Sequence, residues 1–316
     1  MLEELSVQQI SADIIENVER VIIGKREVVK LALVALYCGG HVLLEDVPGV
    51  GKTMLVKALA KSMGSDFKRI QFTPDLLPTD VTGVSVFNQK SGDFEFRPGP
   101  VMTNVLLADE INRSSPKTQS ALLEAMEEHQ VTADGETYNL PNPFFVLATQ
   151  NPIEYEGTFP LPEAQLDRFM LRLRLGYPAF QEEVNLLKRL QYVHPVESLE
   201  QVTKAEEILN IQEAVKRVHV EPALCNYIIN IVHALRGHQQ VYLGASPRGS
   251  LALFKGAQAL AAIAGRDFVL PDDIKVIAKN ALPHRVILKP EAHLKGYSPE
   301  ALVTDILNQV SVPVEG

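Results

Sequence analysis

The chain has 316 residues, of which 46% are hydrophobic and 22% are charged, a balance that is ordinary for a folded globular protein. No apolar run is long enough to span a bilayer, and the acidic residues 1–4 lack the positive charge and apolar core of a secretory signal, so we expect a cytoplasmic protein without membrane insertion. Two cysteines are too few for a disulfide framework or a zinc site, and the net charge of −9 argues against a nucleic-acid partner, because binding of phosphates requires clustered lysines and arginines.

Strands and helices alternate in the first part of the chain. Apolar residues at helical spacing predict helices over 26–37 and 53–63. Short apolar runs predict strands at residues 41–45, 68–72, 105–108, 144–148 and 170–175. This alternation favours an α/β fold in which a parallel sheet lies between layers of helices.

Two insertions interrupt this alternation. Residues 81–100 alternate apolar and polar side chains around the turn Lys90-Ser91-Gly92. Residues 130–140 turn at Asp134-Gly135, a dipeptide that favours tight hairpin turns. Both patterns predict β-hairpins inserted into the α/β unit.

The pattern changes at Gly176-Tyr177-Pro178, a break that ends the last predicted strand. Beyond it the periodicity is helical only, over about residues 180–192, 205–218, 222–237, 247–264 and 271–281. We therefore predict two domains, an α/β domain over residues 1–177 and an all-α domain over residues 178–316.

The segment at residues 46–53, Asp-Val-Pro-Gly-Val-Gly-Lys-Thr, lies between a predicted strand and a predicted helix. Glycines let backbone N–H groups approach phosphate oxygens closely, and the N-terminus of the following helix attracts the same anions. Lys52 is expected on the β- and γ-phosphates and Thr53 on Mg²⁺. The usual pattern has glycine where this chain has Asp46, a residue type that tolerates unusual backbone angles. The expected nucleotide contacts are Val47, Pro48, Gly49, Val50, Gly51, Lys52, Thr53 and Met54.

An acidic pair follows the predicted strand at 105–108. Such a strand delivers Asp109 and Glu110 to the carboxyl edge of the sheet, where the phosphate loop is also expected. Asp109 would hold Mg²⁺, and Glu110 would orient and polarise an attacking water. The polar segment 148–152 follows the next strand, and an amide there, Asn151, could position the same water; otherwise Asn-Pro is simply a turn.

The chain resembles an AAA+ ATPase and, within that class, the MoxR family. The segments that carry the resemblance are residues 21–25, 43–53, 71–78, 108–113, 148–152, 161–169 and 246–249. Together they cover about residues 20–290. MoxR-like loops also have Asp at the position of Asp46. The resemblance implies ATP and Mg²⁺ as cofactors of a P-loop AAA+ domain, with a helical lid after it.

The resemblance also implies roles for single residues. Ile23 and Gly24 are expected to line the adenine pocket, and Asn151 matches the first sensor of the family. Arg168 matches the arginine finger, which reaches the γ-phosphate of the neighbouring subunit; the alternative is a surface arginine paired with Asp167.

Two further arginines match positions that respond to nucleotide. Arg248 matches the second sensor, at the start of a lid helix, where it reports ATP to the helical domain. A cation in the first turn opposes the helix dipole, which favours a bound anion there. Arg113 is a further candidate for a contact with a neighbouring subunit.

Three interpretations of the ATP hydrolysis remain. The first is a homo-hexameric, chaperone-like ATPase that remodels or activates partner proteins, typically ones with a von Willebrand factor A domain. The others are the motor subunit of a metal-chelatase-like complex and a nucleic-acid motor. The 81–100 hairpin has Lys90 and Arg97 against Asp93 and Glu95, and the 130–140 hairpin has no Lys or Arg. These tips do not suit nucleic acid, whereas the residues do not separate the first interpretation from the chelatase one.

Overall fold

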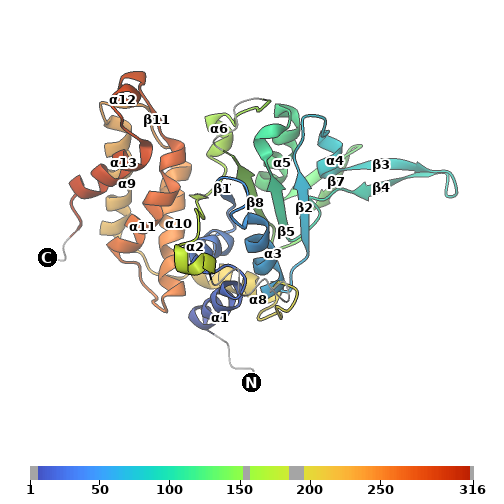
Figure 1. Cartoon of the computed structure of the whole chain (residues 1–316), viewed down its shortest axis with the longest axis horizontal. Coiled ribbons are helices and arrows are strands. Elements are labelled where there is room, and N and C mark those ends of the chain that lie inside the picture. Colours follow the sequence, from blue (N-terminus) through green and yellow to red (C-terminus); the bar gives the residue numbers. More distant parts are fainter. Residues whose placement is uncertain (1–5, 152–156, 185–195, 314–316) are drawn as a thin grey trace.

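A five-stranded parallel sheet lies at the centre of the protein (Figure 1). The computed structural model describes residues 6–151, 157–184 and 196–313. The strand order is β2-β5-β8-β1-β9. The strands are β1 (Val42–Glu45), β2 (Phe67–Gln71), β5 (Val105–Asp109), β8 (Phe145–Gln150) and β9 (Leu171–Leu173). The predicted parallel sheet is confirmed, although its fifth strand is shorter than the predicted 170–175.

Helices cover both faces of this sheet, which explains why its central strands β5 and β8 are buried almost throughout. They include α1 (Val7–Glu19), α2 (Arg26–Tyr37), α3 (Lys52–Ser62) and α5 (Pro116–Glu128). Alternate strand residues point to opposite faces. Leu44 and Leu107 enter the hydrophobic cluster that contains α1, α2 and α3, while Leu43 and Leu106 enter the cluster that contains α5. The centre of the sheet is therefore buried on both sides, whereas the edge strand β2 exposes Lys68, Arg69 and Gln71.

The part of the chain from residue 196 to 313 is helical. Its helices are α8 (Ala205–Val215), α9 (Pro222–Gly237), α10 (Pro247–Ile263), α11 (Pro271–Ala281), α12 (Pro290–Leu294) and α13 (Pro299–Gln309). A short antiparallel pair, β10 (Val241–Leu243) with β11 (Ile287–Leu288), and a 3-10 turn, η2 (Pro283–Arg285), complete it; the sequence did not predict them. The predicted helix at 180–192 is helical from 180 to 184, and its remainder lies outside the described residues.

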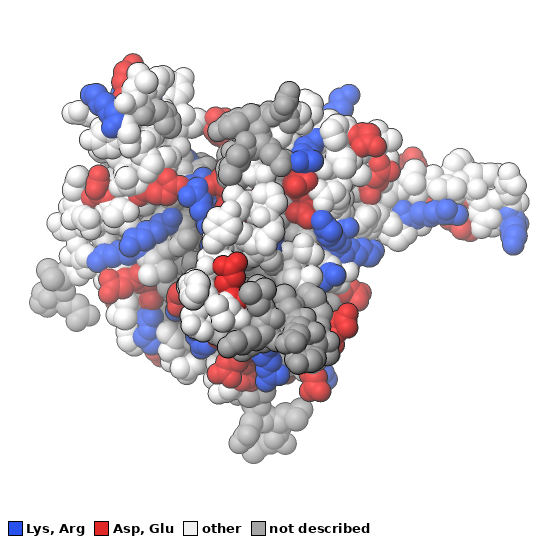
Figure 2. Space-filling model, viewed as in Figure 1, with Lys and Arg blue, Asp and Glu red and all other residues white. Residues whose placement is uncertain are grey.

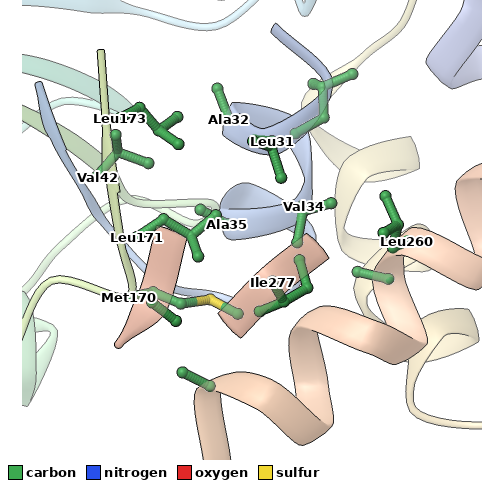
Figure 3. Packing of buried hydrophobic residues seen from close by; sticks show 14 of the residues in the cluster. Leu31, Ala32, Val34, Ala35, Val42, Met170, Leu171, Leu173, Leu260 and Ile277 are labelled. Atoms are coloured by element: carbon green, nitrogen blue, oxygen red, sulfur yellow. The ribbon is translucent and has the colours of Figure 1, made fainter. Parts of the chain in front are cut away.

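The helical part packs directly against the sheet domain. Side chains of α2, β1 and β9 share one continuous hydrophobic cluster with α10 and α11. Figure 3 shows Val34 of α2, Leu171 of β9 and Ile277 of α11 in this cluster. The position of α10 relative to the sheet is therefore fixed by buried apolar contact.

Both predicted hairpins are present and lie on the side of the sheet away from the helical part (Figure 1). They are β3 (Gly83–Asn88) with β4 (Asp93–Pro98) and β6 (Gln130–Ala133) with β7 (Glu136–Asn139). Phe96 of β4 stacks on Tyr138 of β7, with ring centroids 4.0 Å apart. Two short helices complete the sheet domain: α4 (Pro78–Thr82) lies between β2 and β3 in the chain, and α6 (Glu163–Leu166) lies between β8 and β9. In the described residues, no helix combines the length and apolar character needed to cross a membrane.

Candidate active site

The predicted polar groups converge at the carboxyl edge of the sheet. Glu45 at the end of β1 lies opposite Gln150 at the end of β8, and β8 pairs in parallel with β5, which ends at Asp109. Asn151, directly after β8, is buried, and the N–H of Asp46 donates to the carbonyl of Gln150. This is the edge at which open α/β sheets bind their ligands.

The backbone of the phosphate loop has the form that the sequence predicts. Gly49 and Gly51 have φ of +86° and +93°, values that favour glycine. Helix α3 begins at Lys52, and no side chain caps its first N–H groups. A β-carbon at Gly49 would meet nothing within 4 Å, so the space beside this glycine is open. These N–H groups fit an anion such as a nucleotide phosphate.

Lys52, the first residue of α3, turns its side chain back to the phosphate loop. Its Nζ donates a hydrogen bond of 2.8 Å to the carbonyl of Asp46. Thr53 and Met54 follow it in the first turn of α3, half-buried at the same end of the helix. The ammonium group is therefore held at the mouth of the loop, where the β- and γ-phosphates would bind.

Asp46 has a structural reason to replace the usual glycine. Its buried carboxylate accepts hydrogen bonds from the backbone N–H groups of Leu175 (2.5 Å) and Gly176 (3.0 Å). These contacts tie the loop to the segment that follows β9. Consecutive N–H groups of an extended strand point to opposite sides, so two of them can share one carboxylate only beyond the end of β9 at Leu173.

Both oxygens of Asp109 have partners in the described structure. One accepts a hydrogen bond of 2.6 Å from the Thr149 hydroxyl. The other accepts two bonds from the guanidinium of Arg69 on β2, at 2.6 and 3.0 Å. An acidic group and a hydroxyl at the phosphate edge are the oxygen donors that Mg²⁺ prefers, so Asp109 and Thr53 fit the predicted metal site.

Glu110 is held by three contacts in an uncommon backbone conformation. Its φ of +56° is rare outside glycine, and such strain is frequent at functional sites. Its N–H donates to the Thr149 hydroxyl (2.8 Å), and its carboxylate accepts from the Gln71 amide (2.6 Å) and pairs with Arg113 (3.2 Å). Arg113, a candidate for a contact between subunits, thus binds the acid of its own chain in this structure.

The expected adenine side of the site lies beside the loop. An added β-carbon at Gly51 would lie 3.5 Å from the side chain of Ile22, which places the 22–24 segment against the phosphate loop. Ile23 is half-buried and Gly24 has φ of +72°. The Glu182 carboxylate covers Gly24 so closely that a β-carbon there would lie 1.7 Å from its oxygen.

Arg168 and Arg248 lie together at the opposite, amino edge of the sheet. Arg168 comes just before β9, and Met170 donates its N–H to the carbonyl of His41, just before β1. Arg168 Nη2 is 3.1 Å from one oxygen of Glu127 on α5, and Arg248 pairs with the other oxygen. The alternative in which Arg168 pairs with Asp167 is wrong, because the Asp167 carboxylate binds Ser246 and Arg285 instead.

These arginines line a hollow of about 330 Å³. Its wall includes Glu127 and also Lys255, which lies two turns after Arg248 on the same face of α10. Arg248 lies at the start of a helix, as predicted, since α10 begins at Pro247. The hollow is therefore a second cluster of cations, separated from the phosphate loop by the sheet.

Known proteins resemble this chain over almost its whole length. Two family profiles match it, one described as ATPase family associated with various cellular activities (AAA) over residues 41–171 and one as AAA lid domain over residues 233–306. Chaperone MoxR1 of Mycobacterium tuberculosis is 43% identical over 94% of this chain and 81% of its own length. The chain belongs to the MoxR family of AAA+ ATPases.

Two other proteins are also similar to this MoxR-family chain. An uncharacterised Bacillus subtilis protein, YeaC, is 59% identical over 95% of the chain and 94% of its own length. A crystal structure of a candidate ATPase from Cytophaga hutchinsonii matches with a TM-score of 0.92 and 42% identity, covering 98% of this chain and 96% of that one. The fold described above is thus shared with that solved structure.

Several residues at this MoxR-family site were not predicted from the sequence. Arg69 and Gln71, which bind Asp109 and Glu110, come from β2. Thr149, which binds Asp109, lies on β8, two residues before Asn151. The position of Gln71 at the end of a strand could have indicated it, because β2 pairs with β5 and ends beside Asp109. The sequence around α5 does not indicate that Glu127 pairs with both Arg168 and Arg248.

Proposed function

We propose that this protein hydrolyses ATP with Mg²⁺, and that each active site is completed by a neighbouring copy of the chain in a homo-hexamer. The observation that carries the proposal is the separation of the two halves of the site. The phosphate loop and Glu110 lie at one edge of the sheet, and Arg168 and Arg248 lie at the other. The four residues of β1 alone rise roughly 13 Å, so these arginines do not reach the loop of their own chain.

The residues at the carboxyl edge divide the chemistry among them. The N–H groups of the loop and Lys52 bind the phosphates, and Thr53 and Asp109 would hold Mg²⁺, which neutralises phosphate charge when bound. Glu110 accepts the proton of the attacking water, and Asn151 orients that water. To accept this proton, the Glu110 carboxylate must break its contacts with Gln71 and Arg113. The side chain is half-buried, which allows this movement.

The arginines at the amino edge supply the positive charge that stabilises the γ-phosphate during transfer. Charge builds up on the γ-phosphate oxygens during transfer, and a guanidinium group stabilises it. In the proposed ring, Arg168 meets the γ-phosphate that is bound by the next copy. Because Arg248 shares the Glu127 carboxylate with Arg168, we assign it to the same neighbouring nucleotide.

A mixing experiment tests the shared site. Arg168→Ala keeps its own loop and should hydrolyse ATP slowly, whereas Lys52→Ala keeps its arginines and should be inactive alone. Mixed under assembling conditions, they form some interfaces with an intact loop on one side and Arg168 on the other, and ATP turnover should exceed the mean of the two proteins. Arg26→Ala, which removes a surface arginine paired with Glu19, is the matched control and should turn over like wild type. Full activity of Arg168→Ala as a monomer would contradict the proposal.

We further propose that hydrolysis serves the chaperone-like remodelling or activation of cytoplasmic partner proteins, including ones with a von Willebrand factor A domain. A 43% identical relative is named a chaperone. The projecting β3–β4 hairpin exposes Phe87 and Phe94, and its Lys90 and Arg97 are balanced by Asp93 and Glu95. Figure 2 shows this arm mostly white, with blue along one edge and at its end. A protein surface suits this hairpin better than nucleic acid does.

Neither DNA nor RNA should therefore stimulate ATP turnover at physiological salt; a several-fold stimulation that salt abolishes would contradict this assignment. A pull-down with Glu110→Gln would identify the partner.

A further inference from the structure

We infer that Arg285 is a positioning residue for Arg168: it clamps the backbone on both sides of that arginine and so fixes where the neighbouring nucleotide is met. The inference rests on the proposed role of Arg168 at the subunit interface. Arg285 lies in η2 of the helical part, and its side chain is 2% exposed. It does not itself line the phosphate loop, and it acts through the segment 167–170.

All five N–H groups of the Arg285 guanidinium have acceptors. Nε donates to the Asp167 carboxylate at 2.8 Å. Nη2 donates to the carbonyls of Asp167 (3.1 Å) and Phe169 (2.7 Å). Nη1 donates to the carbonyl of Met170 at 3.2 Å and to that of Ala281. Three of the four carbonyls belong to residues that directly flank Arg168 or follow it.

The second oxygen of Asp167 connects this clamp to Arg248. It accepts a hydrogen bond of 2.6 Å from the hydroxyl of Ser246, the residue that caps the N-terminus of α10. The same hydroxyl accepts a bond of 3.0 Å from the N–H of Arg248. Asp167 therefore precedes one arginine in the chain and binds the helix cap beside the other. The Asp167 carboxylate thus links the backbone of Arg168 to the start of α10, while Glu127 binds both guanidinium groups.

The chemistry of the clamp favours a geometric role over mere packing. A buried guanidinium is tolerated only when its donors are satisfied, and an apolar side chain would fill the same space without that demand. The planar, rigid fork of arginine suits several fixed acceptors at once, whereas the single ammonium of lysine does not. Burial lowers the pKa of Arg285, but the neighbouring Asp167 carboxylate opposes that shift. The result is a rigid link between the helical part and the backbone of Arg168.

The substitution Arg285→Lys tests this role, because it keeps a cation beside Asp167 and removes the fork. We expect ATP turnover to fall on the order of tenfold or more, since small misplacements of a catalytic group cost that much, while ATP affinity stays at the wild-type value. Arg266→Lys is the matched control. Arg266 forms a two-bond pair with Asp273, also in the helical part, but does not contact the 167–170 segment, so its turnover should stay close to wild type.

The decisive measurement is the same substitution in an Arg168→Ala background. If Arg285 acts only through Arg168, the double variant turns over no more slowly than Arg168→Ala alone. Wild-type turnover of Arg285→Lys, weakened ATP binding, or a full additional loss in the double variant would each overturn the inference. If Arg168→Ala itself turns over at the wild-type rate, the proposed function fails instead.

Ser246→Ala gives a second route that leaves Arg285 intact, should Arg285→Lys fold poorly. It removes the hydroxyl bond to Asp167, and we expect it to slow ATP turnover in the wild-type background. In the Arg168→Ala background the same substitution should cause no further loss. An equal loss in both backgrounds would overturn the inference, because it would show an effect independent of Arg168.

Discussion

Arg168 and Arg248 bind the two oxygens of a single carboxylate, that of Glu127. Two guanidinium groups in one place repel each other unless an anion lies between them. In the isolated chain Glu127 is that anion, and it is held on α5 facing the hollow. Under the proposed mechanism, the triphosphate bound by the neighbouring copy takes the place of Glu127. The pair of arginines is thus arranged for an anion that its own chain does not bind.

Glu110→Gln should separate ATP binding from hydrolysis. The amide keeps the size of the side chain but cannot accept the proton of water, so turnover should fall on the order of a hundredfold or more. ATP affinity should remain close to wild type, because the loop at 46–53 is untouched. Turnover is measured by phosphate release and affinity by titration. Glu128→Gln, on the exposed end of α5, is the control. Wild-type turnover of Glu110→Gln would show that another group activates water.

Thr149→Val should weaken both the fold and the use of metal. The Thr149 hydroxyl accepts from the N–H of Glu110 and donates to Asp109, and valine leaves both groups buried without that partner. Such a loss costs about 1–3 kcal/mol of stability. Because Asp109 is no longer fixed, more Mg²⁺ should be needed for half-maximal turnover. Denaturant unfolding and a magnesium titration measure the two effects. Thr137→Val on the exposed β6–β7 hairpin should change neither.

The parts of the site that lie within one stretch of chain could be predicted from the sequence. The order strand, glycine loop, helix describes the phosphate loop, and an apolar strand that ends in two acids describes Asp109 and Glu110. Both depend on local conformation and on the parallel sheet, which the alternation of elements also predicts. Helix α5 was missed although Ser115 caps it and Pro116 occupies its first turn, a recognisable start signal.

The contacts between distant segments could not be predicted in the same way. Arg69 meets Asp109 only because β2 pairs with β5 in one particular register. The end of β9 depends on the Asp46 carboxylate, which lies on a different segment. The placement of Arg248 beside Arg168 depends on how the helical part packs on the sheet. The division at residue 177 and the roles of the individual site residues therefore remain predictions.

Acid should destabilise the fold through His41. Burial lowers the pKa of this histidine from 6.5 to about 4, and its Nδ1 accepts the N–H of Val146, a bond that a proton would break. The unfolded chain therefore binds a proton at a higher pH than the folded chain. Between about pH 6 and pH 4 this residue should lower the free energy of unfolding by roughly 1.4 kcal/mol per pH unit.

His41→Gln removes this titration while it keeps a donor for the carbonyl of Met126. Denaturant unfolding of wild type and variant at several pH values isolates the histidine, because the carboxylates titrate equally in both proteins. The stability of the variant should fall less steeply between pH 6 and pH 4. Equal slopes would show that His41 is not kept neutral by the fold.

Arg248→Ala should decide whose nucleotide this arginine contacts. If it serves the neighbour, the variant binds ATP through its own loop, hydrolyses it slowly and regains turnover when mixed with Lys52→Ala, which supplies an intact Arg248. If it serves its own chain, the loop of the variant lacks its partner in every mixture, and no gain appears. The mixture of Arg168→Ala with Lys52→Ala, run in parallel, shows that mixed rings can work. A gain with Arg168→Ala but none with Arg248→Ala would place Arg248 on the nucleotide of its own chain.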